Sequence, residues 1–100
     1  MENQKFSELI NSTQPVLIDF FAEWCGPCKA MKPILEEVKQ KMGDKVRVVK
    51  IDVDKNQSLA AQLNVNSVPT LMIFKAGKKE WQKIGVSRVN ELEAAITNLL

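Results

Sequence analysis

Apolar residues recur in two different patterns along the first part of the chain. Over residues 2–11, Phe6, Leu9 and Ile10 lie at helical spacing, which predicts a short first helix. Val16–Phe21 follows a polar loop and is apolar on both faces, with Asp19 as its one polar member. A run of this kind is typical of a central strand that is buried on two sides.

A long amphipathic helix is predicted over Gly26–Met42. Its apolar residues recur at steps of three and four, and Gly43 follows as a stop signal. Pro27 lies in the first turn, where its missing N–H costs nothing, but Pro33 lies inside the helix and removes a backbone hydrogen bond. We therefore expect a kink at Pro33, which would let the first turn point in a different direction from the rest of the helix.

The second half of the chain predicts three more strands and two more helices. Lys45–Asp54 alternates and is rich in β-branched residues, and a short helix follows and ends near Leu63. Strands are predicted at Thr70–Lys75 and Glu80–Ile84, joined by a hairpin turn, and Ser87 is the predicted N-cap of the last helix. Strand, long helix, strand in this order predicts a parallel pair joined by a right-handed crossover, and therefore an α/β fold.

Length and composition limit the classes of function. One hundred residues form a single small domain, residues 1–100, that can bury a core. Fourteen basic and twelve acidic side chains are scattered along the chain and give a net charge of +2, so no electrostatic footprint for nucleic acid is expected. The N-terminus lacks an apolar signal-peptide core, and no stretch approaches the roughly 18 apolar residues of a membrane span. We expect a soluble, cytoplasmic protein.

The two cysteines of the chain, Cys25 and Cys28, lie where the strand pattern gives way to the helical pattern. The pKa of a thiol falls at a helix N-terminus and in a Cys-x-x-Cys pair. This context predicts dithiol/disulfide exchange, with Cys25 as the better-exposed nucleophile and Cys28 as the resolving thiol. Neither step needs a cofactor or a metal.

Three other uses of the cysteine pair are less well supported. A structural zinc site needs four ligands, and hydrolysis by a cysteine nucleophile needs a histidine partner, but the chain has no histidine and no third cysteine. A purely structural disulfide is also disfavoured, because so short a loop constrains the unfolded chain little. A redox centre remains the leading hypothesis.

The residue pattern leaves three further positions open. Asp19 is either buried, with a raised pKa that suits it to exchange the Cys28 proton, or exposed at a strand edge. Lys50 lies in an apolar strand and is more simply explained as the guard of an exposed edge. Pro69 begins a strand and either ends its pairing or forms a cis bond, and composition alone does not justify the cis bond.

The active-site string and its surroundings resemble the thioredoxin family over nearly the whole chain from Phe6 to Leu100. The matching residues are Trp24–Lys29, Asp19–Glu23, Pro33, Lys50, Val68–Thr70, Gly77 and Gly85. The resemblance implies a protein disulfide reductase that binds no cofactor and receives electrons from NADPH through a thioredoxin reductase. It implies a catalytic set of Cys25 as nucleophile, Cys28 as resolving thiol, Asp19 as the buried proton-transfer carboxylate and Lys50 close to it.

The resemblance also implies how disulfide-containing proteins are recognised. Pro69 would be cis and face the cysteine pair, and the Val68 backbone would pair with an extended substrate segment. A flat apolar patch around the sulfur would be formed by Trp24, Gly26, Pro27, Val68 and Gly85. Gly-Pro between the cysteines resembles the reducing members of the family, whereas oxidising and isomerising relatives usually carry a histidine there.

Two departures from the family pattern lead to further expectations. Thioredoxins usually begin with an extra strand before the first helix, which this sequence starts too late to hold. We therefore expect a four-stranded mixed sheet in the order Lys45–Asp54, Val16–Phe21, Thr70–Lys75, Glu80–Ile84, with the first of these at an open edge. Charged residues would protect that edge, so we expect a monomer. Phe21 stands where the family often has tryptophan, and only a packing change is expected there.

Two other functions compete with the reductase. An interaction protein could use the same apolar patch to hold partners without turnover, and replacing both cysteines by serine would leave such binding intact. An oxidase or isomerase of a secretory compartment conflicts with the Gly-Pro pair in the motif, and a strongly oxidising potential would be needed to support it.

Overall fold

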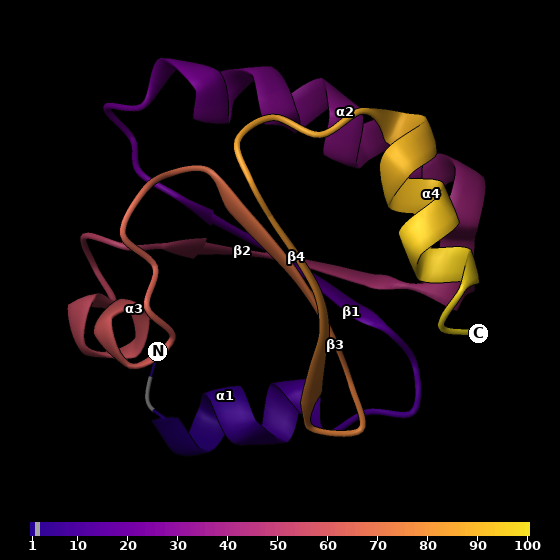
Figure 1. Cartoon of the computed structure of the whole chain (residues 1–100), viewed down its shortest axis with the longest axis horizontal. Helices are drawn as coiled ribbons and strands as arrows, with labels where there is room; N and C mark the ends of the chain where they lie inside the picture. The colour runs from indigo at the N-terminus through magenta and orange to yellow at the C-terminus, as the bar shows by residue number, and fades with distance from the viewer. Residues whose placement is uncertain (2) are drawn as a thin grey trace.

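The computed structural model describes residue 1 and residues 3–100, and within them a central sheet lies between two layers of helices (Figure 1). Helices α1 (Asn3–Ile10) and α3 (Gln57–Gln62) lie on one side of the sheet. Helices α2 (Gly26–Met42) and α4 (Val89–Thr97) lie on the other side. The described part of the chain has no helix that combines the length and the apolar character needed to cross a bilayer.

The sheet has the predicted mixed topology. Its strands are β1 (Val16–Phe21), β2 (Arg47–Asp52), β3 (Thr70–Lys75) and β4 (Lys78–Ile84), in the order β2-β1-β3-β4. β1 and β2 are parallel, whereas β1 with β3 and β3 with β4 are antiparallel. The predicted strand order is therefore confirmed, and β2 lies at an edge. The loops that follow β1 and β2 consequently emerge at the same end of the sheet.

The edge strand β2 is shorter than predicted. The expected strand spanned Lys45–Asp54, but Gly43–Lys45 forms a 3₁₀ turn. At the other end the Asp52 carboxylate accepts the backbone N–H of Asp54 at 2.8 Å and that of Lys55 at 3.3 Å. An aspartate side chain that caps the following amides in this way stabilises a turn, which ends the strand at Asp52.

The β4 boundary also differs from the prediction. β4 begins at Lys78 and not at Glu80, because the hairpin turn consists of Ala76 and Gly77 alone, both with positive φ (51° and 84°). A two-residue turn with left-handed backbone at both positions fits the twist of a hairpin, so pairing resumes at once.

The predicted N-cap of α4 was wrong. The cap residue is Arg88, whose backbone N–H donates to Glu91 Oε1 at 3.2 Å, while Ser87 is fully buried one position earlier. A glutamate three residues into a helix can bond back to the cap amide, which makes a serine at the cap unnecessary.

The other helix predictions agree with the structure closely. α2 ends before Gly43, whose φ of 54° is a conformation that glycine adopts easily. α2 remains one helix through Pro33, and a kink there stays a prediction. α1 was expected over residues 2–11, of which residue 2 lies outside the described residues.

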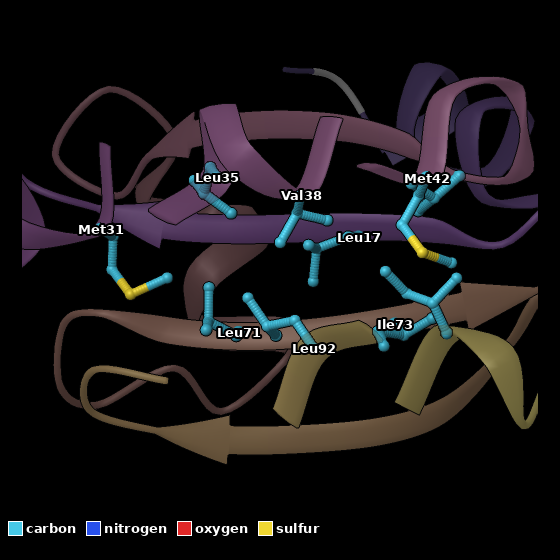
Figure 2. Close-up of a cluster of buried hydrophobic side chains, with 10 residues drawn as sticks. Leu17, Met31, Leu35, Val38, Met42, Leu71, Ile73 and Leu92 are labelled. Carbon is cyan, nitrogen blue, oxygen red and sulfur yellow. The ribbon is translucent and has the colours of Figure 1, made fainter. Parts of the chain in front are cut away.

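The two faces of the sheet bury separate clusters of apolar side chains. Figure 2 shows the cluster between the sheet, α2 and α4, in which Leu17, Leu71 and Ile73 of the sheet meet Leu92 of α4. α2 contributes Met31, Leu35, Val38 and Met42 to it. Because side chains alternate along a strand, Asp19 points to the same face as Leu17. A carboxyl group therefore lies under α2, beside an apolar core.

The opposite face packs against α1 and α3. Ile18, Phe20 and Met72 lie there with Phe6, whose ring meets that of Phe74 edge to face at 5.5 Å between centroids. The β1 side chains on this face are all apolar. Asp19 is therefore the one polar side chain in a strand that is buried on both faces.

Candidate redox site

The cysteine pair lies at the start of α2, directly after the loop that leaves β1. Cys25 is the N-cap residue of α2 and is joined to Cys28 in a disulfide, with 5.3 Å between their Cα atoms. The backbone N–H of Cys28 donates to Cys25 Sγ at 3.1 Å. An N-cap acceptor satisfies one of the unpaired amides of the first helical turn, and here that acceptor is a sulfur atom. In the reduced protein the same amide favours a negative charge on Cys25.

Solvent exposure does not distinguish the two cysteines as predicted. Cys25 is 3% exposed and Cys28 is 6% exposed, so the expectation that Cys25 is the better-exposed residue was wrong. The reason is that Cys25 is covered by the segment before β3, where the Val68 carbonyl oxygen lies 3.6 Å from Cys25 Sγ. The Cys28 amide, and not exposure, is what makes the two sulfur atoms different.

The segment that covers Cys25 contains the cis bond implied by the resemblance. The Val68–Pro69 peptide bond is cis, and the Pro69 carbonyl accepts the backbone N–H of Gly85 at 2.8 Å. Of the residues expected around the sulfur, Val68 thus contacts Cys25, and Gly85, directly after β4, is hydrogen-bonded to Pro69, the residue next to Val68.

The surface around Cys25 is apolar and exposed. Trp24 is 72% exposed, and its indole N–H donates to Asp54 Oδ2 at 2.9 Å, which fixes the ring against the loop after β2. Gly26 and Pro27 are also exposed at the start of α2. The residues named for the apolar patch therefore lie at one end of the molecule, on three separate segments.

Sequence reasoning missed three residues of this surface. Ile84 and Val86 flank Gly85 and are 61% and 41% exposed, so they extend the apolar patch, while Asp54 holds the Trp24 ring. The sequence predicted Ile84 as the last residue of a strand and gave it no place in the site. Strand alternation could have indicated this exposure. Trp81 and Ile84 are an odd number of residues apart and so point to opposite faces of β4.

Asp19 is fully buried, which decides between its two interpretations. Neither carboxylate oxygen has a hydrogen-bond partner among the described residues. Burial raises the pKa of Asp19 from 3.8 to about 6, and the positive charge of Lys50 opposes this rise. A carboxyl group with a pKa in this range can accept and return a proton near neutral pH.

Lys50 fits both of its proposed interpretations. It is the register partner of Asp19 in the parallel β1–β2 pair, and it is exposed on the edge strand. Its ammonium group lies 4.6 Å from the centroid of the Phe21 ring, which is a cation–π distance. The Phe21 side chain therefore has a second role besides packing, because it holds Lys50 beside the redox site.

Metal binding finds no support in the part of the chain that the structure describes, where no three histidine, cysteine or carboxylate side chains form a cluster. The chemistry that the site supports is exchange of thiols and disulfides at Cys25 and Cys28.

Comparison with known proteins places these features in a family. The family model described as Thioredoxin matches residues 1–98. The chain belongs to the thioredoxin family. It is 43% identical over 94 residues to a thioredoxin of Acidithiobacillus ferridurans, covering 94% of this chain and 87% of that protein. It is 41% identical over 100 residues to a thioredoxin of Alicyclobacillus acidocaldarius subsp. acidocaldarius, covering all of this chain and 95% of that protein.

Solved thioredoxin structures have the same fold. The oxidised crystal structure of mitochondrial thioredoxin 3 from Saccharomyces cerevisiae matches with a TM-score of 0.85 and 38% identity, over 95% of this chain and 88% of that one. A mutant thioredoxin from Halobacterium salinarum NRC-1 matches with a TM-score of 0.88 and 32% identity, over 99% of this chain and 86% of that one.

Family membership and the close cysteine pair together establish the activity. The protein is a thioredoxin-type protein-disulfide oxidoreductase, and it reduces disulfides through a redox-active cysteine pair without a prosthetic group. Disulfide-containing proteins are its class of substrate.

Proposed function

We propose that Cys25 is the attacking thiolate and Cys28 the resolving thiol of a general protein disulfide reductase. The observation that carries this order is the hydrogen bond from the Cys28 backbone N–H to Cys25 Sγ, at 3.1 Å. It stabilises negative charge on Cys25, and Cys28 has no equivalent donor from Cys25. A thiolate is the reactive form of cysteine in exchange.

The proposed reaction proceeds in two displacements. The Cys25 thiolate attacks one sulfur of the substrate disulfide, forming a mixed disulfide and releasing the other substrate sulfur as a thiolate. Cys28 then loses its proton and attacks Cys25 Sγ, which releases the second substrate thiolate and forms the Cys25–Cys28 disulfide. Two electrons pass from the protein to the substrate. The released thiolates take up protons, one of them from Cys28.

Asp19 is the proposed acceptor of the Cys28 proton. It lies under α2 on the same face of the sheet, and its pKa of about 6 leaves it ionised near pH 7 but close enough to take up a proton. We propose that the positive charge of Lys50 prevents the pKa of Asp19 from rising further. Without that charge, burial would favour the protonated form, which cannot accept a proton.

Substrate recognition is proposed to use the apolar patch and the backbone before β3. Trp24, Gly26 and Pro27 are exposed and Gly85 is half-buried, and the Val68 carbonyl, next to Pro69, lies beside Cys25. An extended substrate segment that pairs with Val68 would bring its disulfide to Cys25 Sγ. This mode of binding depends mostly on backbone and shape, which suits a reductase of many proteins.

The oxidised protein is proposed to be recycled in the cytoplasm by an NADPH-dependent thioredoxin reductase. The test is the reduction of insulin disulfides, driven first by dithiothreitol and then by NADPH with a thioredoxin reductase. We expect this chain to accelerate both reactions, and NADPH consumption to require its cysteines. Acceleration with dithiothreitol alone would contradict the proposed electron source but not the reductase chemistry. No acceleration in either assay by the folded protein would contradict both.

The protein is proposed to act as a monomer despite the open edge of β2. Arg47 and Lys50 lie on that strand, and charged side chains disfavour pairing between edges. In sedimentation velocity, the sedimentation coefficient should not change with protein concentration. A dimer that dissociates when further charges are placed on β2 would show that the edge is used for association.

A further inference from the structure

A second feature adjoins the cysteine pair and shares Cys28 and Lys50 with the mechanism above, but its cavity has no part in that mechanism. A crevice of about 200 Å³ opens beside Cys28. The residues that line it include Phe21, Ala22, Lys29, Lys32 and Lys50. We call it the lysine crevice. Three basic residues, from β2 and the first turns of α2, thus line one cavity together with a redox-active cysteine.

The cations of the lysine crevice form no ion pair among the residues that the structure describes. The ion pairs among the described residues involve Lys39, Lys41, Lys55 and Lys83, and none of the three crevice lysines takes part in one. Lys50 lies over the Phe21 ring, and Asp19 is its register partner on β1. Like charges that surround one cavity repel each other, so an anion placed between them is stabilised by all three.

Two carboxyl groups lie close to the lysine crevice and weaken its positive potential. Glu23 lines it, but its ion-pair partner is Lys55, at 3.9 Å, and its side chain is 77% exposed. Asp19 is buried below, and is the register partner of Lys50. Three lysines against these two groups leave the crevice positive even when both carboxyls are ionised.

We propose that the lysine crevice binds an acidic side chain of the protein substrate, close in sequence to the cysteine that Cys25 attacks. The inference rests on the proposed role of Cys25. Cys28 lines the crevice and lies 5.3 Å from Cys25 between Cα atoms, so the crevice is adjacent to any mixed disulfide on Cys25. An extended segment advances about 3.3 Å per residue, which places a side chain two or three residues from the substrate cysteine within reach.

The lysine crevice and the apolar patch would then select different parts of one substrate. Val68 adjoins Cys25, and Gly85 is hydrogen-bonded to the neighbouring Pro69, so this side presents backbone and apolar surface. The lysines line the crevice with Cys28 and present positive charge. A substrate segment with apolar residues on one side of its cysteine and Asp or Glu on the other complements both surfaces. This preference would rank disulfides by the charge of their neighbours, which an apolar patch alone cannot do.

The test compares two synthetic peptides, identical except for Glu or Gln two residues from a cysteine that carries the same disulfide-linked chromophore. The second-order rate constant is measured with the reduced protein and divided by that with dithiothreitol, which removes differences in intrinsic reactivity. We expect the Glu peptide to react about threefold faster at low salt, as a few exposed charge contacts allow. The preference should disappear at about 0.5 M salt.

Variants show whether the lysine crevice causes the preference. Lys32→Gln should reduce the ratio of the two rate constants towards one, and Glu23→Gln should increase it. Lys39→Gln removes the same charge from an exposed position of α2 outside the crevice, and should leave the ratio unchanged. Equal ratios in the parent protein, Lys32→Gln and Lys39→Gln would overturn the inference.

The outcome is separable from the proposed function. If the Gln peptide reacts with the protein well above the dithiothreitol background while the Glu peptide gains nothing, the reductase mechanism stands and the crevice assignment fails. If neither peptide reacts with the folded, reduced protein, the proposed role of Cys25 fails, and the assignment of the crevice fails with it.

Discussion

Replacing Cys25 by serine is expected to lower the rate of insulin reduction by about 1,000-fold or more, to the dithiothreitol background. A serine hydroxyl is not ionised near neutral pH and does not attack disulfides, so the first displacement cannot occur. The N-cap hydrogen bond from the Cys28 amide is retained, because serine is a preferred N-cap residue. The loss should therefore be chemical, with thermal unfolding of the reduced variant close to that of the reduced parent protein.

Cys28→Ser should fail in a different way, which makes the pair of variants informative. Cys25 remains able to attack, but no thiol is present to displace the substrate, so a covalent mixed disulfide should accumulate. Non-reducing electrophoresis and mass spectrometry would show one substrate attached through Cys25. If Cys25→Ser accumulates the adduct and Cys28→Ser does not, the roles of the two cysteines are reversed. Each variant thus serves as the control for the other.

The fold could be predicted from the sequence because its elements have clear hydrophobic periods. Val16–Phe21 is apolar on both faces and Gly26–Met42 repeats at helical spacing, and both have the predicted bounds. The errors in the prediction lie at the ends of elements, where side-chain hydrogen bonds determine the boundary. Asp52 ends β2 by capping the amides that follow it, and Glu91 makes Arg88 the cap of α4. Periodicity contains no information about such hydrogen bonds.

The candidate site was less predictable, because its residues are brought together by tertiary structure. The strand pattern gave Asp19 two equally plausible environments, and only the packing of α2 over β1 shows that it is buried. Asp54 joins the site through its hydrogen bond with the Trp24 indole, which no local pattern indicates, whereas strand alternation indicates only that Ile84 faces away from Trp81. The cis bond at Pro69 was implied by family resemblance and by nothing in the composition.

Asp19→Asn is expected to stabilise the protein at pH 7 while slowing the reaction. The pKa of Asp19 rises from 3.8 to about 6 on folding, so the folded state binds a proton more tightly than the unfolded state. Stability from this group is therefore greatest below about pH 4, and decreases as the pH rises towards 6. Above pH 6 the cost of the buried charge is constant, at up to about 3 kcal/mol.

The asparagine variant removes that charge and keeps the shape of the side chain. Its free energy of unfolding, measured in urea on the oxidised protein, should exceed that of the parent by about 2 to 3 kcal/mol at pH 7. Near pH 4 the parent carboxyl is protonated in the folded state, and the difference should largely vanish. Asp44→Asn changes an exposed carboxylate and should have little effect at either pH. A gain of the same size at both pH values would show that ionisation of Asp19 is not its cause.

The same variant should slow the second displacement and not the first. Asparagine cannot accept the Cys28 proton, and loss of a positioned general base costs about 100-fold or more. Rapid-quench sampling with excess reduced variant should therefore detect the mixed disulfide on Cys25 as a transient, which then decays slowly. If the variant forms and resolves the mixed disulfide at the parental rates, Asp19 has no part in proton transfer. Its buried charge would then lower the stability of the protein with no benefit to the reaction.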